Sequence, residues 1–396
     1  MSQIKKQGVL MPFVIFLFIT AILPKQIHAQ DSETPVYFTI NIHIEPGVFI
    51  NGAYCNDPVF FSNGVEILDS LMVAAESIGA KLSVFTEYPF LYGAINFQGE
   101  GNNIITELIA RGHSVGLHSH FTSNLFSQGA DNLCGDATFP EVTEDNYVDH
   151  FEYIWAKVLG KQNIYEDVQS AYGAHGPTII DELASKGIQA IYLEFCSYPD
   201  AGNPLYCYEV GYRGSSLADC PSITNQPPLN NLLQIPTTNP YAYLSSRYAR
   251  ARITDSACVT PVLLDTALCG NWYQEDFDMV YSTVNKAVYS PKDSNAVNTI
   301  GMVFHIHNFN DESKSYCGFT SMDPDYDELA LFKNWLQTDI ASLHETGLLK
   351  FANSNELIAM AKGGSIFTIG GDNKSQRGLA ETKLSQSVQS FNDNHL

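Results

Sequence analysis

Strand-like and helix-like segments alternate along most of this 396-residue chain, and that alternation limits the folds it can adopt. Residues 36–44 are rich in β-branched and aromatic residues, a composition typical of a strand. Apolar residues then recur at helical spacing from Val65 to Ile78, and Gly79 follows where a helix would end. Residues 81–88 predict a second strand. A strand, a helix and a strand in this order indicate two parallel strands joined by a crossover helix.

The same order of elements continues toward the C-terminus. About seven strands separated by helices predict a mostly parallel α/β domain, built as a barrel or as a doubly wound sheet. In either architecture, ligands bind at the carboxyl ends of the strands. The further strands are expected at 113–121, 168–172, 188–195, 231–238, 298–309 and 348–357, and the further helices at 102–112, 145–160, 177–187, 275–289 and 326–347.

The first 29 residues have the pattern of a secretory signal peptide. Lys5 and Lys6 precede an apolar run from Val9 to Leu23, and Ala29 is a small residue at the expected cut. The run is short for a membrane span, and no second apolar stretch reaches its length. We therefore expect a secreted or periplasmic protein with no membrane span in the mature chain.

One large domain is expected after the cut. It would occupy residues 30–362, and a Gly-rich and polar tail would follow at 363–396. Two irregular segments, at 197–231 and 250–272, are interpreted as insertions between the regular elements.

The cysteines predict disulfides. The chain has eight, an even number, and an exported protein with that count favours disulfide bonds. No two are spaced as Cys-x-x-Cys, so a cysteine zinc site is not expected. We expect the bonds mostly to tie the two insertions to the rest of the domain.

The charge of the chain argues against some classes of partner. The formal net charge is −22, and removal of Lys5, Lys6 and Lys25 with the signal peptide makes it −22 − 3 = −25. A surface this acidic disfavours binding to nucleic acid and to anionic membranes. The charge therefore indicates a solubility surface.

Polar side chains lie two residues apart at the carboxyl ends of three predicted strands. Residues two apart on a strand point to the same face, so each group would share one face. Five of the 11 histidines fall in these positions, and imidazole and carboxylate are ligands that zinc prefers. The groups together predict a metal or catalytic site. They are Asn41, His43 and Glu45, then His118 and His120, and then His305 and His307.

Four segments resemble a known family when they are taken in order. VYFTINIHIEP, GHSVGLHSH, SAYGAHGPTIIDELASKGIQAIYL and VFHIHNF are similar to the polysaccharide deacetylases of the NodB-homology type, over roughly residues 35–360. The resemblance implies a distorted (β/α) barrel and a metal-dependent, usually zinc-dependent, hydrolase. Members of the family remove N- or O-acetyl groups from chitin, peptidoglycan, xylan or related glycans.

The resemblance also implies a set of metal ligands. Residues 112–118 are similar to the family's Gly-His-x-x-Gly-x-His, whose last histidine, here His118, binds the metal. The family places a second histidine four residues later, where this chain has Thr122, so His120 is the expected substitute. His113, just after a helix end, is expected to be structural or capping. One zinc or similar divalent ion would be bound by His118, His120 and Glu45.

The chain departs from the family at two motifs. The family's pair of aspartates, of which the first is a general base and the second a metal ligand, is absent. Divergent members of the family have Asp-x-Asp or Asp-x-Glu instead, and that motif would place His43 at the position of the base and Glu45 at the position of the ligand. His43 could instead be a fourth ligand or a packed barrel histidine. The arginine-containing third motif is also absent, since residues 169–173 read QSAYG.

The remaining site residues follow from the last strands. The family's catalytic histidine is similar to either His305 or His307, and these two compete for the role of general acid. Glu194, near the end of the strand at 188–195, could orient one of them or contact substrate. Tyr172 and His175 are further candidates for substrate binding.

Three functions remain open at this point. The first is an exported metal-dependent enzyme that deacetylates a glycan, in which a metal-bound water attacks the acetyl carbonyl and a histidine protonates the leaving group. The second is a carbohydrate-binding protein that has the same barrel without its chemistry. The third is a glycoside-cleaving barrel, which needs two carboxylates across the cleft, and here Glu45 and Glu194 are the candidates.

Overall fold

The computed structural model describes most of the expected domain and leaves several predicted features outside its range. The predicted signal peptide, the predicted tail and most of the two expected insertions lie outside the described residues, as do Glu45, His120 and His175. The described residues are 34–44, 53–119, 134–135, 137–138, 142–173, 177–194, 209–212, 232–237, 274–290, 292–309 and 327–363.

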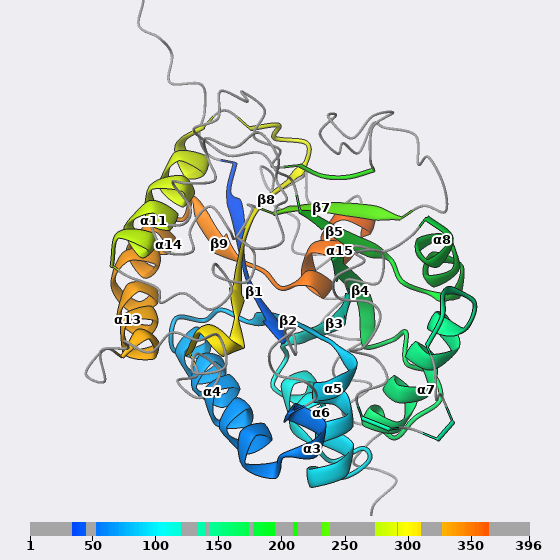
Figure 1. Ribbon diagram of the computed structural model, residues 1–396. Helices are drawn as coiled ribbons and strands as arrows, with labels where there is room; N and C mark the ends of the chain where they lie inside the picture. Colours follow the sequence, from blue (N-terminus) through cyan, green and yellow to red (C-terminus); the bar gives the residue numbers. More distant parts are fainter. Residues whose placement is uncertain are drawn as a thin grey trace, which may run out of the picture.

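Seven parallel strands form a ring, which confirms the predicted (β/α) barrel (Figure 1). A short strand, β6 (Glu209–Val210), closes it by pairing antiparallel with β8, while Gly211 bridges to Gln234 of β7. In order around the ring the strands are β8 (Val297–His305), β1 (Val36–Ile44), β2 (Leu82–Thr86), β3 (Ser114–Ser119), β4 (Val168–Gly173), β5 (Ala190–Glu194) and β7 (Leu233–Thr237).

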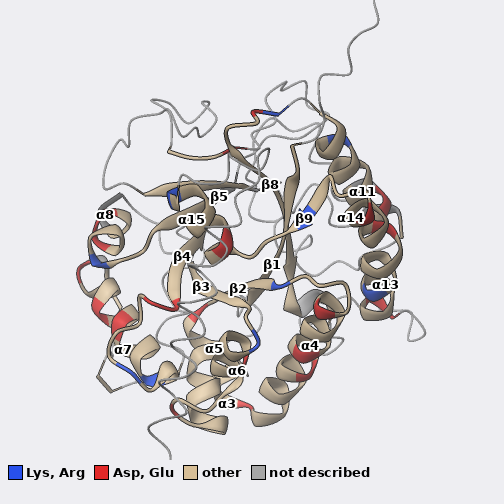
Figure 2. Cartoon of the chain, turned by 180° about the vertical axis from the view of Figure 1, so that it is seen from behind, with Lys and Arg blue, Asp and Glu red and all other residues tan. Residues whose placement is uncertain are grey.

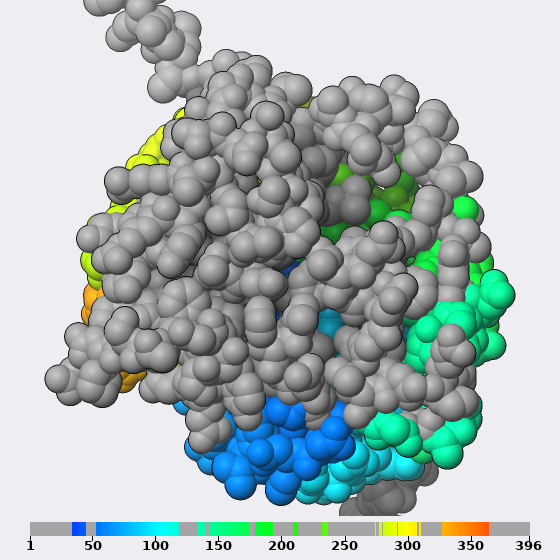
Figure 3. All heavy atoms as spheres, in the orientation of Figure 1, coloured from blue at the N-terminus to red at the C-terminus, as the bar shows by residue number. Residues whose placement is uncertain are grey.

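Helices surround the ring, as the alternating pattern predicts. Figure 3 shows the segments around residues 53–110 along the lower rim of the barrel. The helices and single-turn elements are α3 (Ala53–Asn56), α4 (Pro58–Ser77), α5 (Tyr88–Gly93), η1 (Ala94–Gln98), α6 (Ile104–Ala110), η2 (Glu144–Asn146), α7 (Tyr147–Leu159), α8 (Pro177–Lys186), α11 (Gln274–Tyr289), η4 (Ile306–Phe309), α13 (Glu328–Trp335), η5 (Leu336–Ile340) and α14 (Ala341–Glu345).

Figure 2 shows acidic residues on several outer helices, α4 and α11 among them. Within the described ranges, α4 is also the one helix that is long and apolar enough to cross a membrane, judged by length and composition alone. Its Leu68, Leu71 and Met72 are fully buried in the core between the helices and the sheet. The apolar composition of α4 is therefore explained by packing.

The side chains of each ring strand alternate between two packed layers. On β1, Phe38 belongs to the outer core and packs edge-on against Trp335 of α13, with ring centroids 6.3 Å apart. Asn41 and His43 point the other way, into the ring, and both are fully buried. The period of two that is read from the sequence therefore separates an apolar outer face from a polar inner face.

One end of the barrel is plugged by a helix that the sequence did not predict. We expected a strand over 348–357, but β9 (Leu349–Phe351) ends early and α15 (Ser354–Gly363) follows. Asn353 and Glu356 explain the change, because each accepts the other's backbone N–H, at 3.0 and 2.8 Å respectively. This reciprocal cap starts a helix where the strand pattern would otherwise continue.

The N-terminus of α15 is bonded to the amino ends of the strands. The Ser354 N–H donates to Ser83 Oγ at 2.9 Å and to Ser114 Oγ at 3.2 Å, and Ser354 Oγ lies 2.9 Å from the Tyr192 hydroxyl. Leu357 joins the apolar cluster inside the ring. The amino end of the barrel is thus closed, and only the carboxyl end remains for a site.

A disulfide joins the segments that follow β1 and β3. Cys55 of α3 is bonded to Cys134, which confirms one disulfide, and the other six cysteines lie outside the described residues. The α3 end of this bond is held firmly, because Tyr54 is 1% exposed and its carbonyl lies against Gly93, where an added Cβ would clash with it. The bond therefore fixes the later segment to a rigid part of the core.

We predict that the double change Cys55→Ser and Cys134→Ser lowers the free energy of unfolding by about 2–4 kcal/mol, because the bond closes a 79-residue separation in the unfolded chain. Urea denaturation of both proteins measures the difference. Alkylation of these two cysteines in the unreduced, denatured protein, detected by peptide mapping, would contradict the pairing.

Candidate functional site

Three histidines from three strands meet inside the carboxyl end of the barrel. His43 lies near the carboxyl end of β1. Its ring centroid lies 4.1 Å from that of His118 on β3 and 5.3 Å from that of His305 on β8. All three are at most 1% exposed. Because β8 and β2 pair with opposite edges of β1, His118 and His305 flank His43 from opposite sides.

Aromatic rings pack around the histidines inside the ring. Tyr172 of β4 has its ring centroid 4.1 Å from that of His43 and 5.9 Å from that of His118. Phe85 of β2 lies 5.8 Å from His43, and Tyr172 also stacks on Tyr192 of β5 at 5.3 Å. Tyr172, a candidate for substrate binding, is fully buried and packs against the rings of His43 and His118.

Gly116 explains one requirement of the Gly-His-x-x-Gly-x-His segment. A Cβ at this position would lie 2.7 Å from the Phe85 ring and 2.7 Å from the Ser170 carbonyl oxygen. Only glycine lets Phe85 lie against β3 directly below His118. The glycine two residues before His118 thus leaves the space that the Phe85 ring occupies.

His113, in the same segment, lies at the opposite end of β3 and confirms the expectation of a structural role. Its Nδ1 accepts the Leu82 N–H at 2.9 Å, so the hydrogen of the neutral ring is on Nε2, which donates to Glu76 Oε1 at 3.2 Å. Burial lowers the pKa of His113 to about 4. His113 therefore links β3 to the start of β2 and to the end of α4.

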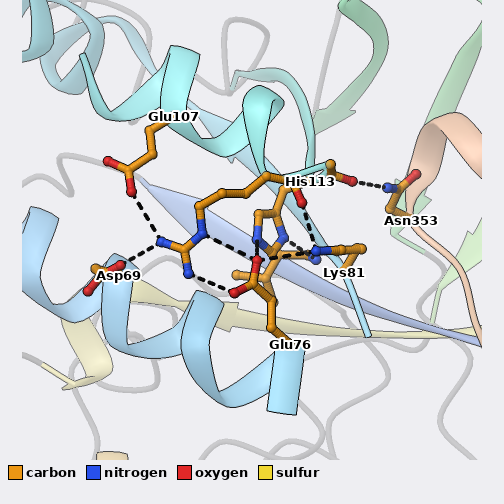
Figure 4. Close-up of polar contacts among 9 residues, drawn as sticks. Asp69, Glu76, Lys81, Glu107, His113 and Asn353 are labelled. Atoms are coloured by element: carbon orange, nitrogen blue, oxygen red, sulfur yellow. Dashed lines mark hydrogen bonds and ion pairs between the residues drawn. The ribbon is translucent and has the colours of Figure 1, made fainter. Parts of the chain in front are cut away.

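Glu76 is the centre of an ionic network around His113 (Figure 4). Arg111 donates from Nη2 to Glu76 Oε2 at 2.8 Å and from Nη1 to Asp69 at 2.7 Å, and Lys81 lies 3.2 Å from Glu76. The hydrogen bond from Arg111 lowers the pKa of Glu76 to about 2. This network joins α4, α6, β2 and β3 at the closed end, away from the three histidines.

A carboxylate that the sequence analysis did not single out follows β2 at the same end of the ring as the histidines. Glu87 directly follows β2, is 7% exposed, and donates its N–H to the Ile44 carbonyl oxygen at the end of β1. Residues 81–88 predict a strand that contains Glu87. The sequence places Glu87 near the carboxyl end of the predicted strand 81–88, two residues after Phe85. His43 and His118 likewise lie near the carboxyl ends of their own strands.

The prediction that His305 and His307 share one strand face is wrong. β8 ends at His305, and Ile306–Phe309 form the 3₁₀ turn η4. The alternation of side chains stops where the strand stops, so only His305 is placed by the barrel. Glu194 is the last residue of β5, at the same end of the ring.

The metal ligands stay a prediction. Glu45 and His120, two of the three expected ligands, lie outside the described residues. In the described part of the chain, no group of three or more His, Cys, Asp or Glu side chains is arranged to hold a metal ion. His118 is therefore the one expected ligand whose position can be stated.

Comparison with known proteins gives likenesses of fold. No family model and no curated protein sequence matches the chain. The Puue allantoinase has a TM-score of 0.45 at 11% identity, over 84% of this chain and 92% of its own. A protein assigned as a polysaccharide deacetylase from Mycobacterium smegmatis has a TM-score of 0.45 at 10% identity, over 87% of this chain and 96% of its own. These values give no residue-by-residue correspondence.

We predict that His113 makes the protein less stable as the pH falls from about 6.5 toward 4. The pKa of His113 is lower in the folded protein than in the unfolded chain, so its contribution is complete above pH 6.5 and is lost as the ring is protonated and Nδ1 can no longer accept the Leu82 N–H. The loss should be on the order of 2 kcal/mol.

Urea denaturation between pH 7 and pH 4.5 measures this loss. The range stops there because the stabilisation by Glu76, whose pKa is lowered, begins to be lost only below pH 4.5. In His113→Gln the dependence on pH should be much weaker, since the amide does not titrate. Equal slopes in the two proteins would contradict the assignment.

Proposed function

We propose that the protein is an exported, metal-dependent hydrolase that removes acetyl groups from a glycan. The observation that carries the proposal is the meeting of His43, His118 and His305 at the carboxyl end of the barrel strands. Three imidazoles buried together at the strand ends are unusual for packing alone, because apolar side chains would fill the space at lower cost. Imidazole suits both metal binding and proton transfer.

His118 would hold the ion together with Glu45 and His120. Two imidazoles and a carboxylate suit zinc and leave a position for water. When bound, the ion would supply an activated water and polarise the acyl carbonyl. The rings of Phe85 and Tyr172 pack against that of His43.

His43 and His305 would act on the substrate side. His43 lies between the other two rings and can orient the attacking water. His305 stands on the far side of His43 from His118, where it can give a proton to the departing amine or alkoxide. A positioned acid of this kind contributes typically about 10²–10⁴-fold to the rate.

We predict that His305→Ala slows the release of acetate from acetylated glycans by about 10²–10⁴-fold. Hydrolysis of p-nitrophenyl acetate should fall far less, because its aryl leaving group departs without protonation. The measurement is an acetate-release screen over acetylated chitin, peptidoglycan and xylan fragments, run beside the aryl ester with zinc-loaded mature protein.

His344→Ala is a matched control, since that histidine lies on α14 outside the ring and bonds to the Leu349 carbonyl oxygen. It should leave both rates unchanged. An equal loss on both substrates in His305→Ala would reject His305 as the acid. Glycan binding without any acetate release by the zinc-loaded parent protein would favour the carbohydrate-binding alternative over the enzyme.

A further inference from the structure

We infer that a groove on the outside of the barrel, beside α7, binds a neutral stretch of glycan apart from the three histidines. The groove has a volume of about 520 Å³, within the range of about 300–1,000 Å³ that is usual for small-molecule sites. Its walls are α7, the loop that follows α7 and the turn before α6, all outside the ring of strands (Figure 1). We call it the α7 groove. The inference goes beyond the proposed hydrolase and does not depend on it.

The spacing of residues along α7 gives the helix two faces. One face packs into the core through residues such as Trp155 and Val158, which are fully buried. Tyr153, Ala156 and Lys157 are three and four residues apart, so they lie together on another face, and all three line the groove. The buried face therefore fixes the position of the wall that the other face forms.

Two glycines that touch hold the end of the groove together. Gly160 ends α7 at a φ of 64°, and a Cβ on it would lie 3.0 Å from the Cα of Gly101. The Gly101 N–H donates to the Val158 carbonyl oxygen at 3.0 Å, and Asn103 Nδ2 donates to the same oxygen at 2.8 Å. These bonds join the turn before α6 to the end of α7, so the groove is formed before a ligand arrives and binding costs less ordering.

The charges of the α7 groove balance. Two carboxylates and two ammonium groups line it, so their formal charges sum to 2 − 2 = 0. Such a groove selects neither an anion nor a cation, and the net charge of −22 on the whole chain further disfavours an anionic polymer. The four residues are Glu100, Glu152, Lys157 and Lys161.

Hydrogen-bonding capacity favours a ligand rich in hydroxyl groups. Lys157 can only donate, the Glu100 carboxylate can only accept, and the Gln162 amide can do both. A phosphate or carboxylate only accepts, and an ammonium only donates, so either would leave part of the lining unpaired. A hydroxyl group donates and accepts, and a sugar carries several of them.

The apolar part of the α7 groove is small. Among the described residues that line it there is no Leu, Ile, Val, Met or Phe, so a lipid chain or an apolar peptide side chain finds no pocket. Tyr153 supplies the one aromatic ring of this lining. Lys157 Nζ lies 4.5 Å from the centroid of that ring, and the Tyr153 hydroxyl lies 3.2 Å from Thr138 Oγ1. An oriented ring with a polar tip and an ammonium beside it suits a sugar, which has apolar C–H faces and hydroxyl groups at its rim.

Titration calorimetry of the mature protein with xylohexaose, cellohexaose and mannohexaose tests the inference. None of these glycans carries an acetyl group, so binding is measured without turnover. We expect at least one of them to bind. Ala156→Phe, which fills the groove, should lower the affinity about tenfold or more, and so should the double variant Lys157→Ala and Gln162→Ala, which removes two hydrogen-bonding side chains.

The matched control is the double variant Lys333→Ala and Gln337→Ala, a lysine and a glutamine on α13 and η5, and it should bind as the parent does. Melting temperatures show whether each variant is folded. If Ala156→Phe does not fold, the double variant of Lys157 and Gln162 decides the question.

Three results would overturn the inference. The first is no binding of any of the three glycans, and the second is an equal affinity in the parent and the groove variants, which would place the glycan elsewhere. The third is binding of hexagalacturonate, hexaglucosamine or hexaglycine at least as tight as that of the neutral glycans, which would reject the ligand class. Acetate release is not measured in this titration, so failure of the proposed hydrolase would leave the α7 groove standing, and loss of the groove would leave the hydrolase untouched.

Discussion

Closure of the seven-stranded ring is the constraint on which the rest of the structure depends. Each side chain of a closed strand must lie either against the helices or inside the ring. On β1 the outer set is apolar and includes Phe38, while the inner set becomes polar toward the carboxyl end, at Asn41 and His43. Equivalent positions on β3 and β8 bring His118 and His305 to the same small space. The site is therefore a consequence of how the barrel closes.

The two ends of the barrel have opposite roles, and one short segment reaches both. His113 belongs to the closed end, where it bonds to Leu82 and Glu76. Gly116 lies midway along β3 and leaves space for the Phe85 ring. His118 lies near the carboxyl end of the same strand. The plug formed by α15 and the network around Glu76 hold the amino ends of β2 and β3 in place. This rigidity fixes the histidines at the other end without any direct contact with them.

Local patterns in the sequence were sufficient for the ring but not for its ends. The alternation in residues 36–44 predicted β1 correctly, and spacing alone placed His43, His118 and His305 at strand ends. Spacing failed for His307, because the strand ends at His305 and the turn that follows depends on packing. It also failed for α15, whose cap needs Asn353 and Glu356 to bond to each other rather than to continue a strand. Glu87 was not singled out, because one glutamate at the end of a predicted strand is a weak signal before the pairing of β1 with β2 is known.

The central claim is our proposal that His118 and its neighbours form a metal-dependent site at the carboxyl end of the barrel strands. Anomalous diffraction at the zinc edge, from crystals of the mature protein soaked with zinc, tests it most directly. The account predicts one strong peak bonded to His118 between β1 and β3, and no peak there in the double variant His118→Ala and His120→Ala. A zinc peak bonded elsewhere in the parent protein, or an unchanged peak in the double variant, would contradict it.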